Sequence, residues 1–203
     1  KARVVVVDAA AAPEEIVGAK SLGTGLAIVE APPGFLIAFN QSPGRPLVEP
    51  QPPMGSFMRA FIDALQQPVA SYGDTFSLTR QRVFDESRNR EMPWTHDRLG
   101  DGGLSFFPLP PGTPGVIVAR SGGVRAGENE TSGEAFKRVI ASDTMADYQS
   151  FLVRFPKDEA VPTIQYNLAV RREAEVWAQA LRRNTREAYW TYLATYPDGG
   201  NAE

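Results

Sequence analysis

Apolar runs separated by turns dominate the first forty residues of the chain. RVVVVD (3–8) is a β-branched run that ends in a single acid, which predicts a buried strand. LAIVEA (26–31) and GFLIAFN (34–40) predict two further strands, joined by a Pro-Pro-Gly turn. Because open α/β sheets place their chemistry at the ends of strands, we expect the residues around Asp8 to lie at a functional edge.

Helical patterns follow a long loop in the middle of the chain. Residues 42–55 are dense in proline and glycine, which predicts a surface loop. Ser56 can cap a helix that runs to about Gln67, and residues 75–87 predict a second helix. Four residues of this second helix are expected to point inward: Phe76, Thr79, Val83 and Phe84. Residues 90–108 predict an extended arm that ends in a short strand, LSFF.

An internal repeat occupies the C-terminal region. Residues 134–158 align with residues 175–199 at a constant offset of 41. Each unit has a helical pattern, an Asp-Thr or Asn-Thr cap and a second helical pattern that ends at a proline, which predicts two helical hairpins. Three tyrosines of the second unit line either a peptide-binding groove or, as their helical spacing favours, the core: Tyr189, Tyr192 and Tyr196.

Composition excludes several kinds of chemistry. The 203 residues carry a net charge of −3, so no broad basic field attracts nucleic acid or an anionic membrane. No apolar run approaches the roughly 20 residues that span a bilayer. The chain has no cysteine and one histidine, His96, which excludes disulfides, thiolate metal sites and polyhistidine metal sites within it. We therefore expect no cofactor, no metal and no nucleic-acid or membrane partner.

Several segments, taken in order, match the motifs of one superfamily. VVVVDAA is similar to a strand that ends in Asp-Ala-Cys or Asp-Ser-Cys, and GTGLA (23–27) to a Gly-Leu-Ala segment. GFLIAFN is similar to a Gly-Thr-Leu-Ile-Ala-Tyr-Ala-Thr strand, and GSFMRAFIDAL (55–65) to a helix that opens with Ser-Pro-Phe. PWTHDRL (93–99) matches a Pro-Trp arm. Together they resemble the C-terminal half of the caspase, metacaspase and paracaspase superfamily, especially its bacterial caspase-like members.

The end of the chain adds an independent likeness. YLATYPDG (192–199) resembles the C-terminal helical units of those bacterial proteins. The resemblance implies an α/β fold, namely the C-terminal half of a caspase-like, mainly parallel sheet flanked by helices, followed by an all-α region of helical-hairpin repeats. The expected organisation is a caspase-like portion over 1–107, a linker over 108–133 with a candidate strand at 115–120, and two helical hairpins over 134–203.

The residue that the family uses as its nucleophile is absent. Ala10 stands where the resemblance places the catalytic cysteine, and a methyl group cannot attack a carbonyl. The family's catalytic histidine belongs to a His-Gly segment that this sequence does not contain, and His96 lies in the Pro-Trp arm instead. Both an engineered Cys-to-Ala change and natural loss are open, and the departure of Ala11 and Ala12 from the family's Arg-x-Asn-Pro pattern favours natural loss.

The resemblance also assigns a substrate pocket. In metacaspases the acid two residues before the cysteine helps to line a pocket that selects Arg or Lys, and Asp8 matches that acid. Glu49 matches the family's loop acid, and Ser42, in the SPG segment of the same region, is grouped with them as a substrate-binding residue. The alternatives are a strand-end carboxylate that caps backbone amides for Asp8 and an exposed loop charge for Glu49.

Three hypotheses about function follow. The first is a caspase-like pseudoprotease, inactive as sequenced, that keeps a pocket for a peptide or protein with an exposed Arg or Lys. The second is an active cysteine endopeptidase whose recorded chain is altered, and the third is a scaffold or protein-interaction module. A serine hydrolase that uses Ser42 or Ser105 with His96 is disfavoured, because no G-x-S-x-G pattern is present.

The same resemblance bears on partners and location. It implies a companion chain, or a further part of the same protein, that completes the sheet, because half a sheet exposes an unpaired edge. It also implies a soluble bacterial protein of the cytoplasm or periplasm.

Overall fold

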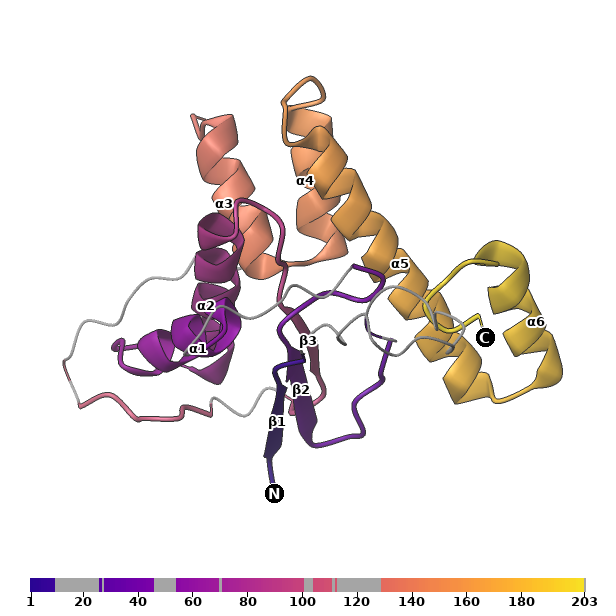
Figure 1. Ribbon diagram of the computed structural model, residues 1–203, viewed down its shortest axis with the longest axis horizontal. Coiled ribbons are helices and arrows are strands. Elements are labelled where there is room, and N and C mark those ends of the chain that lie inside the picture. Colours follow the sequence, from indigo (N-terminus) through magenta and orange to yellow (C-terminus); the bar gives the residue numbers. More distant parts are fainter. Residues whose placement is uncertain are drawn as a thin grey trace, which may run out of the picture.

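The computed structural model describes residues 1–9, 26, 28–45, 54–69, 71–100, 104–110, 112 and 129–202. Three strands and six helices are formed by these residues (Figure 1): β1 (Arg3–Val7), β2 (Phe35–Phe39), α1 (Ser56–Leu65), α2 (Tyr72–Glu86), β3 (Trp94–Asp97), α3 (Ser132–Ser142), α4 (Met145–Arg154), α5 (Val161–Arg183) and α6 (Arg186–Thr195). The mixed α/β class expected from the sequence is confirmed. The predicted strand at 115–120 lies outside the described residues.

The sheet is mixed, with strand order β1-β2-β3. β1 pairs with β2 in parallel, with Val7 opposite Phe39, and β2 pairs with β3 in antiparallel fashion, with Ile37 opposite His96. The expected mainly parallel sheet is therefore represented in the described residues by the β1–β2 pair. The parallel arrangement brings the carboxyl ends of β1 and β2 to the same edge of the sheet.

Helices cover both faces of β2, in keeping with the alternation of its side chains. Leu36 and Ala38 pack against α1 and α2 in one buried cluster, whereas Phe39 packs with Trp94 of β3 and Val170 of α5 in another. Figure 1 shows α1 and α2 on one side of the strands and α5 on the other. Burial on both faces explains why β2 is apolar along its whole length.

The predicted strand over 26–31 is not formed by its described residues. Its backbone groups bond to side chains instead of a neighbouring strand. Asn201 accepts from the Ile28 amide at 3.0 Å and donates to the Ile28 carbonyl at 3.2 Å, and the Ala31 amide donates to His96 Nδ1 at 2.7 Å. The expected turn follows, with Gly34 at φ +81°, a conformation that favours glycine.

The predicted strand LSFF is also wrong, because the third strand, β3, lies earlier in the arm. Residues 104–107 pack instead as a loop on the helices. The Phe106 ring contacts the rings of Phe61 and Phe76 edge-on, with centroids 6.1 Å apart in both pairs. The Tyr72 amide donates to the Leu104 carbonyl at 2.9 Å. Apolar packing and a backbone hydrogen bond thus satisfy this run without a strand partner.

The first two helices differ from the prediction at their starts. Gly55, without a side-chain cap, precedes α1, and the predicted cap Ser56 instead donates its hydroxyl to Glu91. α2 begins at Tyr72, three residues before the predicted start, because Ser71 caps it by accepting from the Asp74 amide at 3.2 Å. The inward face of α2 is as predicted, and all four of its expected core residues are buried: Phe76, Thr79, Val83 and Phe84.

The C-terminal helices share local geometry at positions 41 residues apart. α3 and α5 end at Asp143 (φ 51°) and Asn184 (φ 47°), both in the left-handed region. Thr144 and Thr185 then cap α4 and α6 by accepting from the amide three residues on. α3 begins at Ser132, inside the predicted linker, because Thr131 forms a capping box with the third residue of the helix. α5, with 23 residues, extends well before the second sequence unit.

Candidate functional site at the carboxyl edge of the parallel strands

The chain that leaves β1 is held beside the end of β2. The Asn40 amide donates to the Val7 carbonyl at 3.1 Å. The Asn40 side chain then forms two hydrogen bonds with Ala9: its Oδ1 accepts from the Ala9 amide at 3.1 Å and its Nδ2 donates to the Ala9 carbonyl at 2.7 Å. The backbone on either side of Asp8 is therefore fixed to the neighbouring strand.

Asp8 has an accessible carboxylate at this edge. Its side chain is exposed and makes no hydrogen bond or ion pair with another described residue. Partial desolvation raises the pKa of its carboxyl. The alternative that Asp8 caps backbone amides is therefore not realised within the described part of the chain, and this carboxylate can accept a cationic ligand.

Ser42 occupies a different environment from Asp8. It is only 2% exposed, and its Oγ has no hydrogen-bond partner in the described structure. Gln41 accepts from the Ser42 amide at 3.2 Å and from the Met92 amide at 2.8 Å, and it donates to the Arg90 carbonyl at 3.2 Å. Ser42 is thus enclosed behind the edge, in a position where a ligand at the surface does not reach its hydroxyl.

Two of the predicted site residues, Ala10 and Glu49, lie outside the described residues. Ala9, the last described residue before Ala10, is partly buried and held by Asn40. The structure therefore brings Asp8 to the edge formed by β1 and β2 and places Ser42 beneath the surface.

His96 has a structural environment on β3. Its Nδ1 accepts from the Ala31 amide at 2.7 Å and lies 3.2 Å from the Val29 carbonyl, and burial lowers the pKa of the imidazole. β2 separates His96 from β1, so the ring is about two strand spacings, roughly 10 Å, from the strand that leads to Asp8. Ser105 donates to the Phe107 carbonyl at 2.9 Å, and neither Ser105 nor Ser42 bonds to His96 within the described structure. The geometry gives no support to a serine hydrolase.

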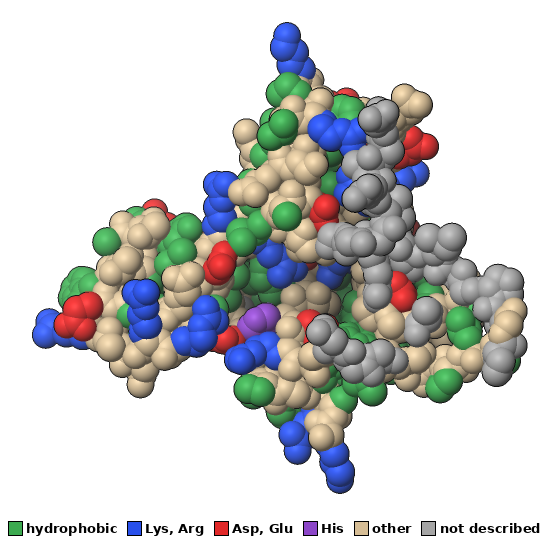
Figure 2. All heavy atoms as spheres, turned by 180° about the vertical axis from the view of Figure 1, so that it is seen from behind, with side chains coloured by type: hydrophobic (Ala, Val, Ile, Leu, Met, Phe, Trp, Pro, Cys, Tyr) green, Lys and Arg blue, Asp and Glu red, His purple; other side chains and the backbone are tan. Residues whose placement is uncertain are grey.

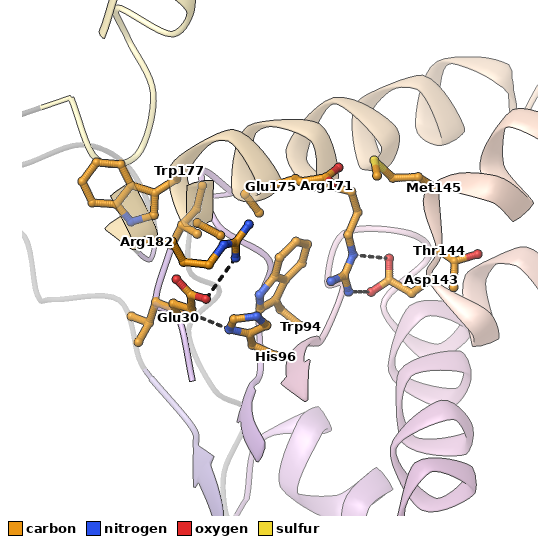
Figure 3. Close-up of a pocket in the computed structure, with 14 residues that line it drawn as sticks. Glu30, Trp94, His96, Asp143, Thr144, Met145, Arg171, Glu175, Trp177 and Arg182 are labelled. Atoms are coloured by element: carbon orange, nitrogen blue, oxygen red, sulfur yellow. Dashed lines mark hydrogen bonds and ion pairs between the residues drawn. The ribbon is translucent and has the colours of Figure 1, made fainter. Parts of the chain in front are cut away.

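A cavity of about 390 Å³ lies between α5, β3 and residues 28–30, away from the edge that carries Asp8. Figure 3 shows the Glu30–Arg182 pair and the Arg171–Asp143 pair on either side of Trp94. Glu30 Oε1 lies 3.3 Å from a guanidinium nitrogen of Arg182, and the Arg171 guanidinium stacks 3.5 Å from the Trp94 ring centroid. Figure 2 shows His96 reaching the surface on this side, among acidic and basic side chains. Sequence reasoning missed this cavity because four distant segments form it.

No metal site is found in the described part of the chain. No group of three or more His, Asp or Glu side chains among the described residues is arranged to hold a metal ion. None of the described helices combines the length and apolar character needed to cross a membrane. Comparisons of the chain with models of protein families, with curated proteins and with solved structures gave no match.

Proposed function

We propose that this chain is a caspase-like protein without peptidase activity that binds peptides or proteins through an exposed Arg or Lys. The observation that carries the proposal is the accessible carboxylate of Asp8, which has no partner among the described residues and stands on backbone that Asn40 holds at the end of the parallel strands. A fixed carboxylate of this kind favours a guanidinium or ammonium group through charge-assisted hydrogen bonds. The motif resemblance assigns the same role to Asp8.

The absence of catalytic groups supports binding without hydrolysis. The chain has no cysteine, and Ala10 stands at the position matched to the nucleophile. The one histidine, His96, accepts a backbone hydrogen bond on β3 and lies across β2 from β1. Hydrolysis by a cysteine peptidase requires a thiolate and a base close to it. The chain has no thiol, and β2 separates its histidine from the strand that precedes the position matched to the nucleophile.

Replacement of Asp8 tests the proposal directly. In a calorimetric titration of the full chain with a peptide that ends in Arg, Asp8→Asn is expected to weaken binding at least about tenfold, because it removes a charge-assisted hydrogen bond. Asn40→Ala is also expected to weaken binding, because it releases the backbone around Asp8 without changing any charge. A peptide that ends in Gln should bind neither the unaltered chain nor the variants.

Asp85→Asn is the matched control, because Asp85 is an exposed acid on α2 and its removal changes the net charge equally. This variant should bind the Arg peptide as the unaltered chain does. Equal losses in Asp8→Asn and Asp85→Asn, or no binding by the unaltered chain, would refute the proposed function.

The outer edge of β1 supports the further proposal of a companion segment that completes the sheet. β1 is terminal in the strand order, and no described residue pairs with its outer edge. Arg3 and Val7 bond to the β2 side, so the intervening residues Val4 and Val6 direct their backbone groups outward. An apolar, unpaired strand edge is a template for another chain.

Amide exchange measures whether this edge is open. In the isolated chain, the amides of Val4 and Val6 are expected to exchange at least about tenfold faster than that of Val5, because of these three only the Val5 amide faces β2. Strong protection of Val4 and Val6 would show that the edge is already covered, and the companion segment would then be unnecessary.

A further inference from the structure

Arg45 is half-buried and differs from three other arginines that are buried or half-buried. Arg80 and Arg171 share the carboxylate of Asp143, with Arg80 Nε 3.4 Å from Asp143 Oδ2. Arg138 lies 2.8 Å from a Glu130 oxygen and 3.3 Å from an Asp147 oxygen. Each of these cations therefore has an acidic partner, as buried charges generally do.

Arg45, in the loop that follows β2, has no acidic partner within the described structure. Its terminal nitrogens donate to the Asn89 carbonyl and to Asn167 Oδ1, both at 3.1 Å, and its guanidinium lies 4.6 Å from the Tyr166 ring centroid. Its Nε is buried and has no hydrogen-bond partner among the described residues. Burial lowers the pKa of this side chain, and the neighbouring Tyr166 offsets part of that effect.

Two further buried polar groups beside Arg45 also have no hydrogen-bond partner in the part of the chain that the structure describes. Asn167 is 4% exposed and its Nδ2 has no acceptor, although its Oδ1 accepts from Arg45. Ser42, whose Oγ has no partner, accepts at its carbonyl from the Arg45 amide at 3.3 Å. Native proteins rarely leave several such groups together unsatisfied, so this cluster is unusual among the buried groups of the described structure.

A cavity of about 340 Å³ opens beside this cluster, lined by Gly44, Arg45, Arg90 and Tyr166. Among the described residues, its walls present two guanidinium groups and a phenol and no carboxylate. Gly44 has φ +73°, a backbone conformation that favours glycine. A concave surface with converging donors and excess positive charge is suited to an anion.

We propose that Arg45, Arg90 and Tyr166 form a binding site for an oxyanion, namely the carboxylate or phosphate group of a small molecule or peptide. Arg45 supplies a half-buried positive charge, and Arg90 and Tyr166 supply further donors around the same cavity. The site is separate from Asp8 and takes a group of opposite charge, so it stands or falls independently of the proposed peptide function.

The test uses the full chain with two probes, inorganic phosphate and succinate, titrated at constant ionic strength. Binding is followed by calorimetry and by the NMR signal of the Arg45 Nε–H group, which is expected to shift on saturation. Arg45→Gln should weaken binding at least about tenfold and Arg90→Gln several-fold, since each removes a charge-assisted hydrogen bond. The more tightly bound probe identifies which oxyanion the site takes.

Arg172→Gln is the matched control, because Arg172 is an exposed arginine on α5, the helix that carries Tyr166. It should leave binding unchanged, and urea unfolding of each variant checks that weakened binding does not come from a loss of folded protein. Equal weakening by Arg172→Gln, or no binding of either probe, would overturn the proposal. A further outcome concerns Glu49, four residues after Arg45. If the unaltered chain binds neither probe and Glu49→Gln binds one of them, the site is occupied by the chain's own carboxylate, and the proposal of an external oxyanion is wrong.

Discussion

Asp143→Ala is expected to lower the free energy of unfolding by about 3–5 kcal/mol, the usual cost of leaving a buried charge without its partner. The Asp143 side chain is 2% exposed. Its carboxylate accepts from Arg171 at both oxygens, lies 3.4 Å from Arg80 Nε and accepts from the Tyr148 hydroxyl at 2.6 Å. Removing this carboxylate leaves two neighbouring guanidinium groups with no anion between them.

The remaining partners of Arg80 and Arg171 cannot replace Asp143, because they are neutral. Arg80 donates to the Pro93 and Ala141 carbonyls at 3.1 and 2.6 Å, and Arg171 stacks on Trp94. The cluster around Asp143 joins α2, β3, the α3–α4 junction and α5. We therefore expect the loss of the Asp143 carboxylate to destabilise the C-terminal helices and also their contact with the sheet.

Asn184→Ala is the matched control for Asp143→Ala. Asn184 has the same left-handed conformation at the end of α5, and its Oδ1 accepts from the Tyr189 hydroxyl at 2.9 Å, but the site is exposed and carries no charge. Asn184→Ala should lower the free energy of unfolding by about 1–2 kcal/mol, the cost of placing alanine in the left-handed region. Urea unfolding of both variants separates backbone strain from the buried charge, and losses within 1 kcal/mol of each other would contradict the expectation.

Acid unfolding provides a second measurement on the same variant. Burial alone disfavours the Asp143 carboxylate, but Arg171 and Arg80 outweigh it and hold its pKa below the usual value. A depressed folded-state pKa contributes stability above the unfolded-state pKa of about 3.9, and this contribution is lost as pH falls through the folded-state value. The unaltered chain should therefore lose more stability than Asp143→Ala as the pH falls below about 4.

The elements that sequence could predict are those specified by local periodicity. The inward face of α2 follows from helical spacing, and the ends of α4 and α6 follow from the prolines after Phe155 and Tyr196. The prediction of a strand over 26–31 was wrong because the groups that bond to its backbone include Asn201, which is 173 residues from Ile28 in sequence. Pattern alone does not distinguish a strand from an extended segment bound by distant side chains.

The two candidate sites also differ in whether the sequence alone could locate them. Asp8 could be located from sequence, because an acid at the end of an apolar strand falls at a sheet edge in any parallel arrangement. The surroundings of Arg45 could not, because Asn167, its side-chain partner on α5, is 122 residues away. The sequence reveals how many charges the chain has, whereas only the fold shows which of them lack a counter-charge.

Gly199→Ala is expected to cost about 1–3 kcal/mol, the usual range for adding a methyl group to a packed site. A Cβ at this position would lie 2.5 Å from Glu173 Oε1, 2.6 Å from the Tyr192 hydroxyl and 3.0 Å from Tyr196 Cβ. Glu173 and Tyr192 cannot move freely, because the Tyr192 hydroxyl donates to Glu173 Oε1 at 2.9 Å and the Tyr192 side chain is fully buried. The added methyl group must therefore either displace the turn at Gly199 or break this hydrogen bond.

Gly200→Ala is the matched control, because a Cβ there would meet only the Leu26 carbonyl, at an ordinary contact distance of 3.7 Å. Displacing the turn in Gly199→Ala should also release Asn201 from the backbone of Ile28. The Ile28 amide should then exchange faster in Gly199→Ala than in Gly200→Ala, alongside the difference in urea unfolding. If both variants match the unaltered chain in both measurements, the C-terminal turn does not hold residues 28–31 in place.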